Sequence, residues 1–590
     1  MMRRISFPIL SAMLLAAVPV VAGTFSGSVR DDTGTPVEGA MVSVTHPQLH
    51  RATTVFTDPV GRFTVPPLEP GVYDVRVRRI GFQDLLLSGA TVDDGAASLD
   101  LRVEPETDPQ ALAWQLPASR WLPLLLVKLS SDAHREEFMR QCAFCHQQGS
   151  WATRVPRSRA DWEKIFTLMG RMGGIISSGL RAELPDAFNA AYADQSYLAA
   201  LTPVTFTPPA GAAATAVITE WDLGGSASTQ HDLAVHPDGT IYSVDTNQDK
   251  LYRLDPHTSQ RWAYDIPRGD SPLGGVFGNS GVLLAPNSNA HVAPHSLQVA
   301  PDGAIWVTLC LGNKIGRFDP KTEQWQIIEQ EDGLYPHTLR FDRKGRVWYT
   351  LAVSNHVGMI DPHTGQRGTI RLPSRDWKQE LALRLTPLFL PLTRYVSPDR
   401  FSGGEGVSLP VPYGIDIAPD GGVWFSQLNE HRIGRIDPDR GTIEMVETPF
   451  PAPRRMRFDS KGNLWIAGFS AGLIARYDPV AKHFDTWKLP TEGTEVPYAL
   501  NVDRRTDTVW ICGTNSDSLI SFDPAREQFT VYPLPTRVTY TREIDFDADG
   551  GVWTSNSNFP TWQIEAPNPK VIRIQPGVVP MQQVAAQAGT

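Results

Sequence analysis

The chain has 590 residues, of which 41% are hydrophobic, so it is too long for one ordinary core and should divide into about three or four domains. Its net charge of -10 is spread along the sequence, and no cluster of lysine and arginine alternates with aromatic residues as a nucleic-acid groove requires. These features predict a soluble multidomain protein and exclude nucleic acid as an expected partner.

The N-terminus has the pattern of a secretory signal peptide. Residues 1–4 carry positive charge, residues 5–21 are largely apolar, and the small residues Ala22 and Gly23 follow. We therefore predict a signal peptide over residues 1–23 and a periplasmic or secreted mature protein. The alternative is an uncleaved membrane anchor, because the apolar stretch is nearly long enough to span a bilayer. No later segment is apolar enough to be a transmembrane candidate.

Residues 24–104 show alternating apolar positions, such as Tyr73, Val75 and Val77, between turn signals, which predicts a small all-β sandwich. The phrases Gly27-Ser28-Val29 and Pro70-Gly71-Val72-Tyr73-Asp74-Val75 resemble the carboxypeptidase regulatory-like domain across this whole length. The resemblance implies a prealbumin-like sandwich, related to carbohydrate-binding folds, that serves as an accessory module without catalytic residues. Carbohydrate or peptide is therefore a candidate partner class.

The run Cys142-Ala143-Phe144-Cys145-His146 has the spacing for covalent attachment of one haem c. Two cysteines three positions apart can form thioether bonds to one haem, and His146 then lies beneath the iron as its proximal ligand. The alternative is a zinc or redox CxxC motif, but no second cysteine pair supplies the remaining zinc ligands. The other two cysteines, Cys310 and Cys512, are expected to be isolated core thiols.

Helical patterns surround this motif, beginning with residues 132–141, so we predict a cytochrome c domain with a lead-in segment over residues 105–205. Met169 is the candidate sixth iron ligand. It follows Trp162 by seven residues, a pattern similar to small class I cytochromes, which carry a tryptophan-containing helix before the axial methionine. Met172 is the alternative ligand, and core packing is the alternative role for Met169.

Residues 217–578 contain an internal repeat of short strands with one aromatic anchor in each unit. Seven anchors at nearly constant spacing predict a seven-bladed β-propeller, because each unit supplies one four-stranded blade and ring closure removes the exposed edges. Two longer intervals place insertions at about 259–292 and 366–411. The anchors are Tyr242, Trp306, Trp348, Trp424, Trp465, Trp510 and Trp553.

The phrases Pro412-Tyr413-Gly414-Ile415-Asp416-Ile417-Ala418-Pro419-Asp420-Gly421 and Arg432-Ile433-Gly434-Arg435-Ile436 resemble the virginiamycin B lyase family over about residues 217–575. Members are seven-bladed propellers, and the namesake enzyme opens a cyclic depsipeptide by magnesium-assisted elimination, with a histidine base and glutamate metal ligands. The family motif has a glutamate two residues before the base, where this chain has Ala293 and Tyr335. No blade contains the full set, so the catalytic residues stay unknown.

Polar residues recur where the first strand of each blade begins. Side chains at equivalent positions of a regular propeller converge near one mouth of the central channel, so these residues form a candidate ligand-binding site. Histidines also bind divalent metals, so a divalent metal is a second candidate occupant. The alternative is that the repeat tolerates polar residues facing a wet channel. The positions are His231, His295, His337, Tyr413, Arg454, Tyr498 and Glu543.

The predicted fold is therefore multidomain and mainly β, with a small prealbumin-like β-sandwich, a helical cytochrome c domain and a seven-bladed β-propeller. The leading functional hypothesis is an exported electron-transfer protein with haem c, in which the propeller binds a small-molecule substrate or a redox partner protein. One alternative is an eliminating lyase similar to the propeller relatives, with an accessory cytochrome. The other is a non-catalytic scaffold that binds carbohydrate or protein.

Overall fold

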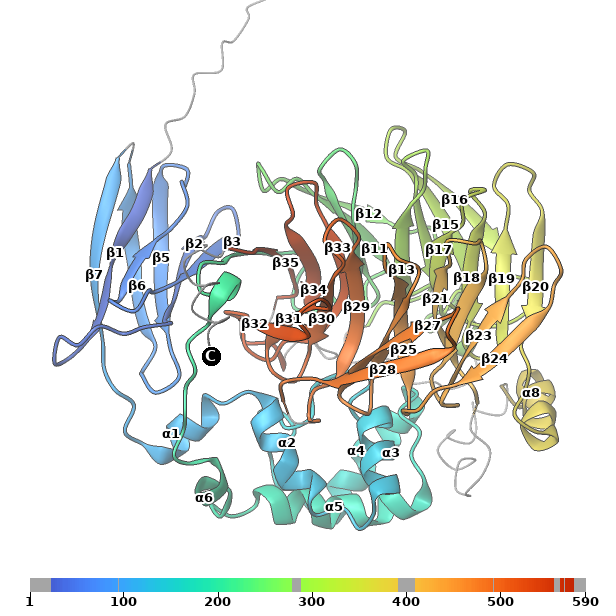
Figure 1. Cartoon of the computed structure of the whole chain (residues 1–590), viewed down its shortest axis with the longest axis horizontal. Helices are drawn as coiled ribbons and strands as arrows, with labels where there is room; N and C mark the ends of the chain where they lie inside the picture. Colours follow the sequence, from blue (N-terminus) through green and yellow to red (C-terminus); the bar gives the residue numbers. More distant parts are fainter. Residues whose placement is uncertain are drawn as a thin grey trace, which may run out of the picture.

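In a computed structural model, the chain forms a β-sandwich, a helical segment and a ring of β-sheets, in that order along the sequence (Figure 1). The predicted signal peptide lies outside the described residues, except for Gly23. None of the described helices is long and apolar enough to cross a membrane. The residues that the structure describes are 23–93, 95–278, 288–390, 409–491, 493–556, 563–566 and 568–577.

The sandwich confirms the small all-β domain predicted from the alternating pattern. One sheet has the strand order β4-β1-β7, and the facing strands have the order β3-β2-β5-β6. Tyr73, Val75 and Val77 alternate along β5 and are all buried, as the period of two in a strand requires. The strands are β1 (Thr24–Asp31), β2 (Met41–His46), β3 (Arg51–Phe56), β4 (Arg62–Thr64), β5 (Gly71–Arg78), β6 (Leu85–Val92) and β7 (Ala96–Val103).

The helical segment follows the sandwich and lies along one face of the ring of sheets (Figure 1). The side chains of Ser131, Ser158 and Ser177 accept hydrogen bonds from the first turns of α3, α4 and α5, which fixes where these helices begin. Trp162 on α4 stacks on Phe188 of α5, with ring centroids 4.4 Å apart. The helices are α1 (Pro109–Trp114), α2 (Ala118–Leu126), α3 (Asp132–Gln141), α4 (Arg159–Arg171), α5 (Ser178–Tyr192), α6 (Tyr197–Leu201) and the 3-10 turn η1 (Gly211–Ala213).

The repeat region forms seven groups of four antiparallel strands. The first four groups contain β9 (Gln230–Val235), β10 (Ile241–Asp245), β11 (Lys250–Leu254), β12 (Arg261–Asp265), β13 (Pro294–Val299), β14 (Ile305–Leu309), β15 (Lys314–Asp319), β16 (Gln324–Glu329), β17 (Pro336–Phe341), β18 (Val347–Leu351), β19 (His356–Ile360), β20 (Arg367–Arg371), β21 (Pro412–Ile417), β22 (Val423–Gln427), β23 (Arg432–Ile436) and β24 (Ile443–Glu447). The other three contain β25 (Pro453–Phe458), β26 (Leu464–Gly468), β27 (Leu473–Asp478), β28 (His483–Lys488), β29 (Pro497–Asp503), β30 (Thr508–Gly513), β31 (Ser518–Asp523), β32 (Gln528–Pro533), β33 (Thr541–Phe546), β34 (Val552–Asn556), β35 (Lys570–Gln575) and β8 (Val217–Asp222).

These groups are the blades of a seven-bladed β-propeller. The first strands of successive blades contact one another, and β33 of the last blade contacts β9 of the first, so the ring is closed. The last blade takes its outer strand, β8, from the chain that precedes the first blade. Two short helices, α7 (Gly275–Gly278) and α8 (Trp377–Phe389), lie in the predicted insertions between blades. Ring closure agrees with the seven predicted repeats, and it leaves the outer strands of the blades as short edges.

All seven aromatic anchors are buried on the second strand of their blades. In three blades the indole also donates a hydrogen bond to the aspartate that begins the preceding turn. The acceptors are Asp342, Asp459 and Asp547, at 2.9, 3.0 and 2.9 Å from the indole nitrogens. The repeat of aspartate, turn and tryptophan therefore fixes these three hairpins against the cores of their blades.

The sandwich and the propeller share one sheet. Strand β8 pairs with β35 on one side and with β3 of the sandwich on the other, which produces an eight-stranded sheet. Arg78 on β5 adds a buried polar contact across the same junction. Its guanidinium donates to the Glu565 carboxylate at 2.6 and 2.7 Å and to the Pro535 carbonyl oxygen at 3.0 Å, and it also pairs with Asp84.

Replacing this guanidinium should weaken the junction. Arg78→Met removes the cation bonded to the Glu565 and Asp84 carboxylates, and Glu565 keeps the longer ion pair with Arg76 at 3.7 Å. We expect a loss of about 3 kcal/mol, the low end for a buried pair, because both carboxylates are partly exposed. The measurement is the midpoint of thermal unfolding. Arg384→Met, which removes an exposed arginine paired with Glu380 on α8, is the matched control and should change the midpoint little. Equal midpoints for the two variants would contradict the role assigned to Arg78.

Candidate functional site

The strand register defines which residue of each blade faces the channel mouth. The first strand pairs its opening residue with the end of the second strand, as in Pro497 with Gly513 and Thr541 with Asn556. The residue that follows the opening residue faces the mouth. In the last blade this residue is Arg542, so the prediction of Glu543 at this position is wrong by one residue. A register shift within each first strand makes the position hard to count from the aromatic anchor. The mouth residues are His231, His295, His337, Tyr413, Arg454, Tyr498 and Arg542.

The structure brings the other six predicted residues together. The rings of His231 and His295 lie 3.7 Å apart between centroids, and those of His295 and His337 lie 4.0 Å apart. His337 is also 4.0 Å from the ring of Tyr413. All of these side chains are at most 7% exposed. The predicted convergence is therefore present, but the side chains are packed against one another and not spread around an open channel.

One directional chain of hydrogen bonds joins four of these residues to a carboxylate. Arg454 can only donate, and its Nη2 donates to the Tyr413 hydroxyl at 2.6 Å. Tyr413 then donates to the Tyr498 hydroxyl at 2.9 Å, and Tyr498 donates to Nε2 of His231 at 3.0 Å. The proton of His231 is therefore on Nδ1, which donates to Asp232 at 2.8 Å. Burial lowers the pKa of His231 to about 4, which agrees with this neutral tautomer.

A second set of charged residues lies further along the same strands, with Asp232, Arg455 and Glu543 one position beyond the mouth residues and Arg457 three positions beyond Arg454. Arg455 donates to both carboxylate oxygens of Asp232, at 2.8 and 2.9 Å, and also pairs with Glu543. Arg457 donates to Glu543 at 3.0 Å. All four side chains are buried. Sequence reasoning missed Asp232, Arg455 and Arg457, although the signal was available, because most blades have a small residue where Asp232, Arg455 and Glu543 stand.

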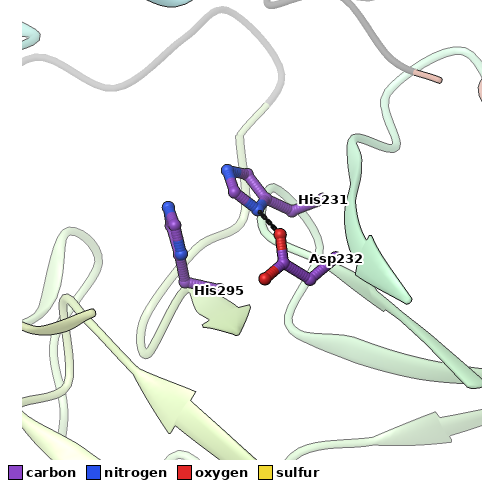
Figure 2. Close-up of side chains that lie close together, drawn as sticks. All are labelled: His231, Asp232 and His295. Carbon is purple, nitrogen blue, oxygen red and sulfur yellow. Dashed lines mark hydrogen bonds and ion pairs between the residues drawn. The ribbon is translucent and has the colours of Figure 1, made fainter. Parts of the chain in front are cut away.

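Figure 2 shows His231, Asp232 and His295, whose nitrogen and oxygen atoms lie within 4.8 Å of one another. This group does not fit a divalent cation. Both oxygens of Asp232 are already bonded to Arg455, and both ring nitrogens of His231 are bonded to neighbours. A metal here would displace these contacts and lie beside a guanidinium, which like-charge repulsion disfavours. The third predicted histidine, His337, is not part of the group.

The segment that carries the two cysteines covers the mouth of the propeller. The Tyr540 hydroxyl donates to the carbonyl oxygens of Ala143 and Phe144, at 2.5 and 2.8 Å, and Arg542 donates to the Cys145 carbonyl oxygen at 3.1 Å. The Phe144 ring lies edge-on to Tyr413, with centroids 6.0 Å apart. The predicted haem-attachment motif is therefore in direct contact with the predicted channel site. Most of the channel residues are more than two hundred positions away from the motif in the sequence.

The structure also gathers the predicted haem residues. Cys142, Cys145, His146, Met169 and Met172 all line one cavity of about 260 Å³ between α3, α4 and α5. The His146 Nδ1 atom donates to the backbone oxygen of the next residue at 3.0 Å, which leaves Nε2 as the nitrogen with an available lone pair. The rest of the lining is mainly apolar and comprises Trp162, Ile165, Phe166, Leu168, Ile176 and Phe188, with Gln141, Gln148, Ala152, Thr153, Arg157, Gly174 and the propeller residue Gln563.

A buried carboxyl group lies beside the contact between the helical segment and the propeller. Glu495 is fully buried, and its Oε1 atom accepts hydrogen bonds from the backbone N–H groups of Val496 and Asn515, at 3.0 and 2.6 Å. Burial is the largest influence on this group and raises its pKa to about 7. The adjacent Thr494 hydroxyl donates to the Ser119 carbonyl oxygen of α2 at 3.0 Å, so the charge state of Glu495 bears on this junction.

Comparison with known proteins assigns the first domain. Residues 24–104 match the carboxypeptidase regulatory-like domain family, which confirms the resemblance found in the sequence. No curated protein matches the chain.

Several solved structures are similar to this chain. The virginiamycin B lyase of Staphylococcus aureus has 16% identity and a TM-score of 0.46, covering 61% of this chain and 98% of that chain. A streptogramin B lyase structure has 18% identity and a TM-score of 0.48, covering 62% and 100%. The hydrazine synthase of Kuenenia stuttgartiensis has 12% identity and a TM-score of 0.42, covering 61% and 98%. The strand pairing and the ring closure described above define the fold.

Neutralising Glu495 should stabilise the protein at high pH only. Its folded-state pKa is raised from 4.5 to about 7, so wild type loses stability as the pH rises between these two values, where the unfolded chain ionises first. Glu495→Gln keeps an oxygen acceptor and removes the charge. We expect it to match wild type near pH 5 and to exceed it at pH 8, by at most about 3 kcal/mol. Thermal midpoints across this pH range provide the measurement.

The Glu331→Gln variant is the control for this experiment, because this glutamate is exposed and the same substitution there should change stability little. A constant difference between Glu495→Gln and wild type from pH 5 to pH 8 would contradict the raised pKa.

Removing the Tyr540 hydroxyl should loosen the segment that covers the mouth. Tyr540→Phe leaves the Ala143 and Phe144 carbonyl oxygens without their donor, at a cost of about 1–3 kcal/mol. We expect faster hydrogen exchange at the backbone amides of residues 142–146, measured by mass spectrometry. Tyr264→Phe, which removes an exposed hydroxyl from β12, is the control and should leave this exchange unchanged. Unchanged exchange in both variants would show that the segment does not depend on this contact.

Proposed function

We propose that this protein is an exported c-type cytochrome, in which the propeller holds the haem-attachment segment and the haem exchanges electrons with a partner protein or a small-molecule substrate. The observation that carries the proposal is the single cavity lined by Cys142, Cys145, His146, Met169 and Met172. Residues that the sequence motif assigns to haem attachment and ligation thus share one pocket, although Met169 comes from a different helix. Periplasmic or secreted localisation, inferred from residues 1–23, belongs to the same proposal.

The residues of the cavity fit a haem. Its lining is mainly apolar, as the porphyrin face requires, and it includes both cysteines together with His146. The hydrogen bond from Nδ1 to a backbone carbonyl oxygen is the usual way in which a protein orients a histidine ligand and frees its Nε2 atom for iron. Arg157 adds one positive charge, which suits a propionate. A haem c bound here would supply a one-electron iron couple.

The propeller contributes rigidity to this site. Tyr540 and Arg542 bind the backbone of residues 143–145, so the position of the attachment segment depends on the start of β33 in the last blade and not on the helices alone. Gln147 adds hydrogen bonds to the Thr514 and Thr539 carbonyl oxygens, at 2.6 and 2.7 Å. A fixed cofactor needs little rearrangement when it gains or loses an electron, which favours electron transfer.

The eliminating-lyase alternative receives less support. Its chemistry needs an accessible base with glutamate metal ligands, whereas His231 is 4% exposed, bonded at both nitrogens and covered by the segment at residues 142–146. The alternative of a non-catalytic scaffold remains compatible with the sandwich domain, but it gives no account of the cavity. We therefore retain electron transfer as the proposed function.

The test is the visible spectrum of the protein purified from a host that attaches haem c. We expect a covalently retained haem whose methionine charge-transfer band is lost in Met169→Ala and kept in Met172→Ala. Met359→Ala, on β19 of the propeller, is the matched control and should keep the band. Absence of retained haem in wild type would contradict the proposed function. Loss of the band in Met172→Ala instead would move the sixth ligand to that residue and leave electron transfer in place.

A further inference from the structure

The mouth of the propeller contains a buried guanidinium without a counter-ion. Arg454 is 0% exposed, and among the described residues no carboxylate lies within ion-pair distance of it. The neighbouring carboxylates are already occupied, because Asp232 pairs with Arg455, and Glu543 pairs with Arg455 and Arg457. A buried ion without a partner is strongly disfavoured, so the environment of Arg454 needs a further stabilising group.

Aromatic rings stabilise the flat faces of this guanidinium only in part. The Cζ atom of Arg454 lies 3.7 Å from the ring centroid of Tyr498, 4.0 Å from Phe469, and 4.6 Å from both Tyr413 and Phe144. Cation–π attraction acts through the faces of the rings, and each contact is small compared with the penalty for removing an ion from water. The N–H donors lie in the guanidinium plane and still need acceptors.

The donors of Arg454 are incompletely bonded. Nη2 donates to the Tyr413 hydroxyl at 2.6 Å, but Nε and Nη1 are buried and have no hydrogen-bond partner among the described residues. The Nε proton shares one edge of the guanidinium plane with an Nη2 proton, and Nη1 shares the other edge with the second Nη2 proton, so an acceptor at either edge can receive hydrogen bonds from two donors. The unpaired charge and the unpaired donors are independent observations, and both are satisfied by a negatively charged acceptor in this plane.

We propose that Arg454 binds a small anion in the mouth of the propeller, beneath Phe144 of the segment that covers it. The ligand class is a compact monovalent anion, either a halide or a small oxyanion such as nitrite or formate. We take the ligand to be compact because Tyr413, Phe469 and Tyr498 around the guanidinium are buried and Phe144 packs on Tyr413. The inference rests on propeller residues and Phe144, so it does not depend on the attachment of haem.

The decisive measurement uses wild-type crystals grown with bromide as the halide. We expect an anomalous peak in contact with Nε or Nη1 of Arg454. In solution, the thermal midpoint of the full-length protein should rise and then saturate with added bromide, with sulfate at the same ionic strength as the large-anion reference. A water molecule at this position in the crystals, with no saturable rise in the midpoint, would overturn the proposal.

Two variants test the residue. Arg454→Met, which keeps a long apolar side chain among the rings, should abolish the anion-dependent rise. Arg435→Met, which removes a partly exposed arginine paired with Asp420, should preserve it. A rise of equal size in Arg454→Met would contradict the assignment. If Arg454→Met does not fold, the wild-type crystals still decide the question.

Competition between bromide and small oxyanions distinguishes the two types of anion. If nitrite or formate removes the bromide peak and its effect on the thermal midpoint saturates at a lower concentration, the site is an oxyanion site. If the bromide peak persists, the site is a halide site. Either result supports the proposal. The absorption spectrum of the same samples reports haem attachment separately. A protein that retains haem but binds no anion would overturn this inference alone, and one that binds the anion without haem would overturn only the proposed function.

Discussion

The pairing of β8 on both edges determines how the rest of the molecule is arranged. This strand completes the last blade through β35 and joins the sandwich through β3. The helical segment begins after β7 of the sandwich and ends before β8, so the sandwich fixes its first end and the shared sheet fixes its second end. Its path lies along the mouth of the propeller (Figure 1). One strand therefore closes the ring and constrains the segment that covers it.

The contact between residues 142–146 and the mouth changes how the polar mouth residues are interpreted. A ring of histidines and tyrosines around an open channel would be a ligand site, but here Phe144 packs on Tyr413, and the Tyr540 hydroxyl binds backbone oxygens of the segment. The mouth residues form a buried hydrogen-bonded network, and the segment at residues 142–146 binds to them where a ligand would otherwise lie. Electron transfer and anion binding, as proposed above, would then share one rigid interface between the helices and the propeller.

Local periodicity was sufficient for most of the fold. Alternation in β5 predicted the sandwich, apolar spacing marked the helices, and the recurring aromatic anchors gave the number of blades. The candidate site was only partly accessible to the same reasoning. Six mouth positions followed from the repeat, whereas Glu543 was placed one residue too far along its strand, because a register shift in the first strand breaks simple counting.

The sequence by itself determined the sandwich, the propeller and the helices between them, the presence of two cysteines and His146 in one motif, and six of the positions that converge on the propeller axis, because each of these follows from short-range spacing. The tertiary structure alone decided that the motif lies against the mouth, that Asp232 is held by Arg455, and that Arg454 is left without a carboxylate. These contacts join residues hundreds of positions apart. Their geometry depends on ring closure and on how the side chains of several blades pack, which no local pattern encodes.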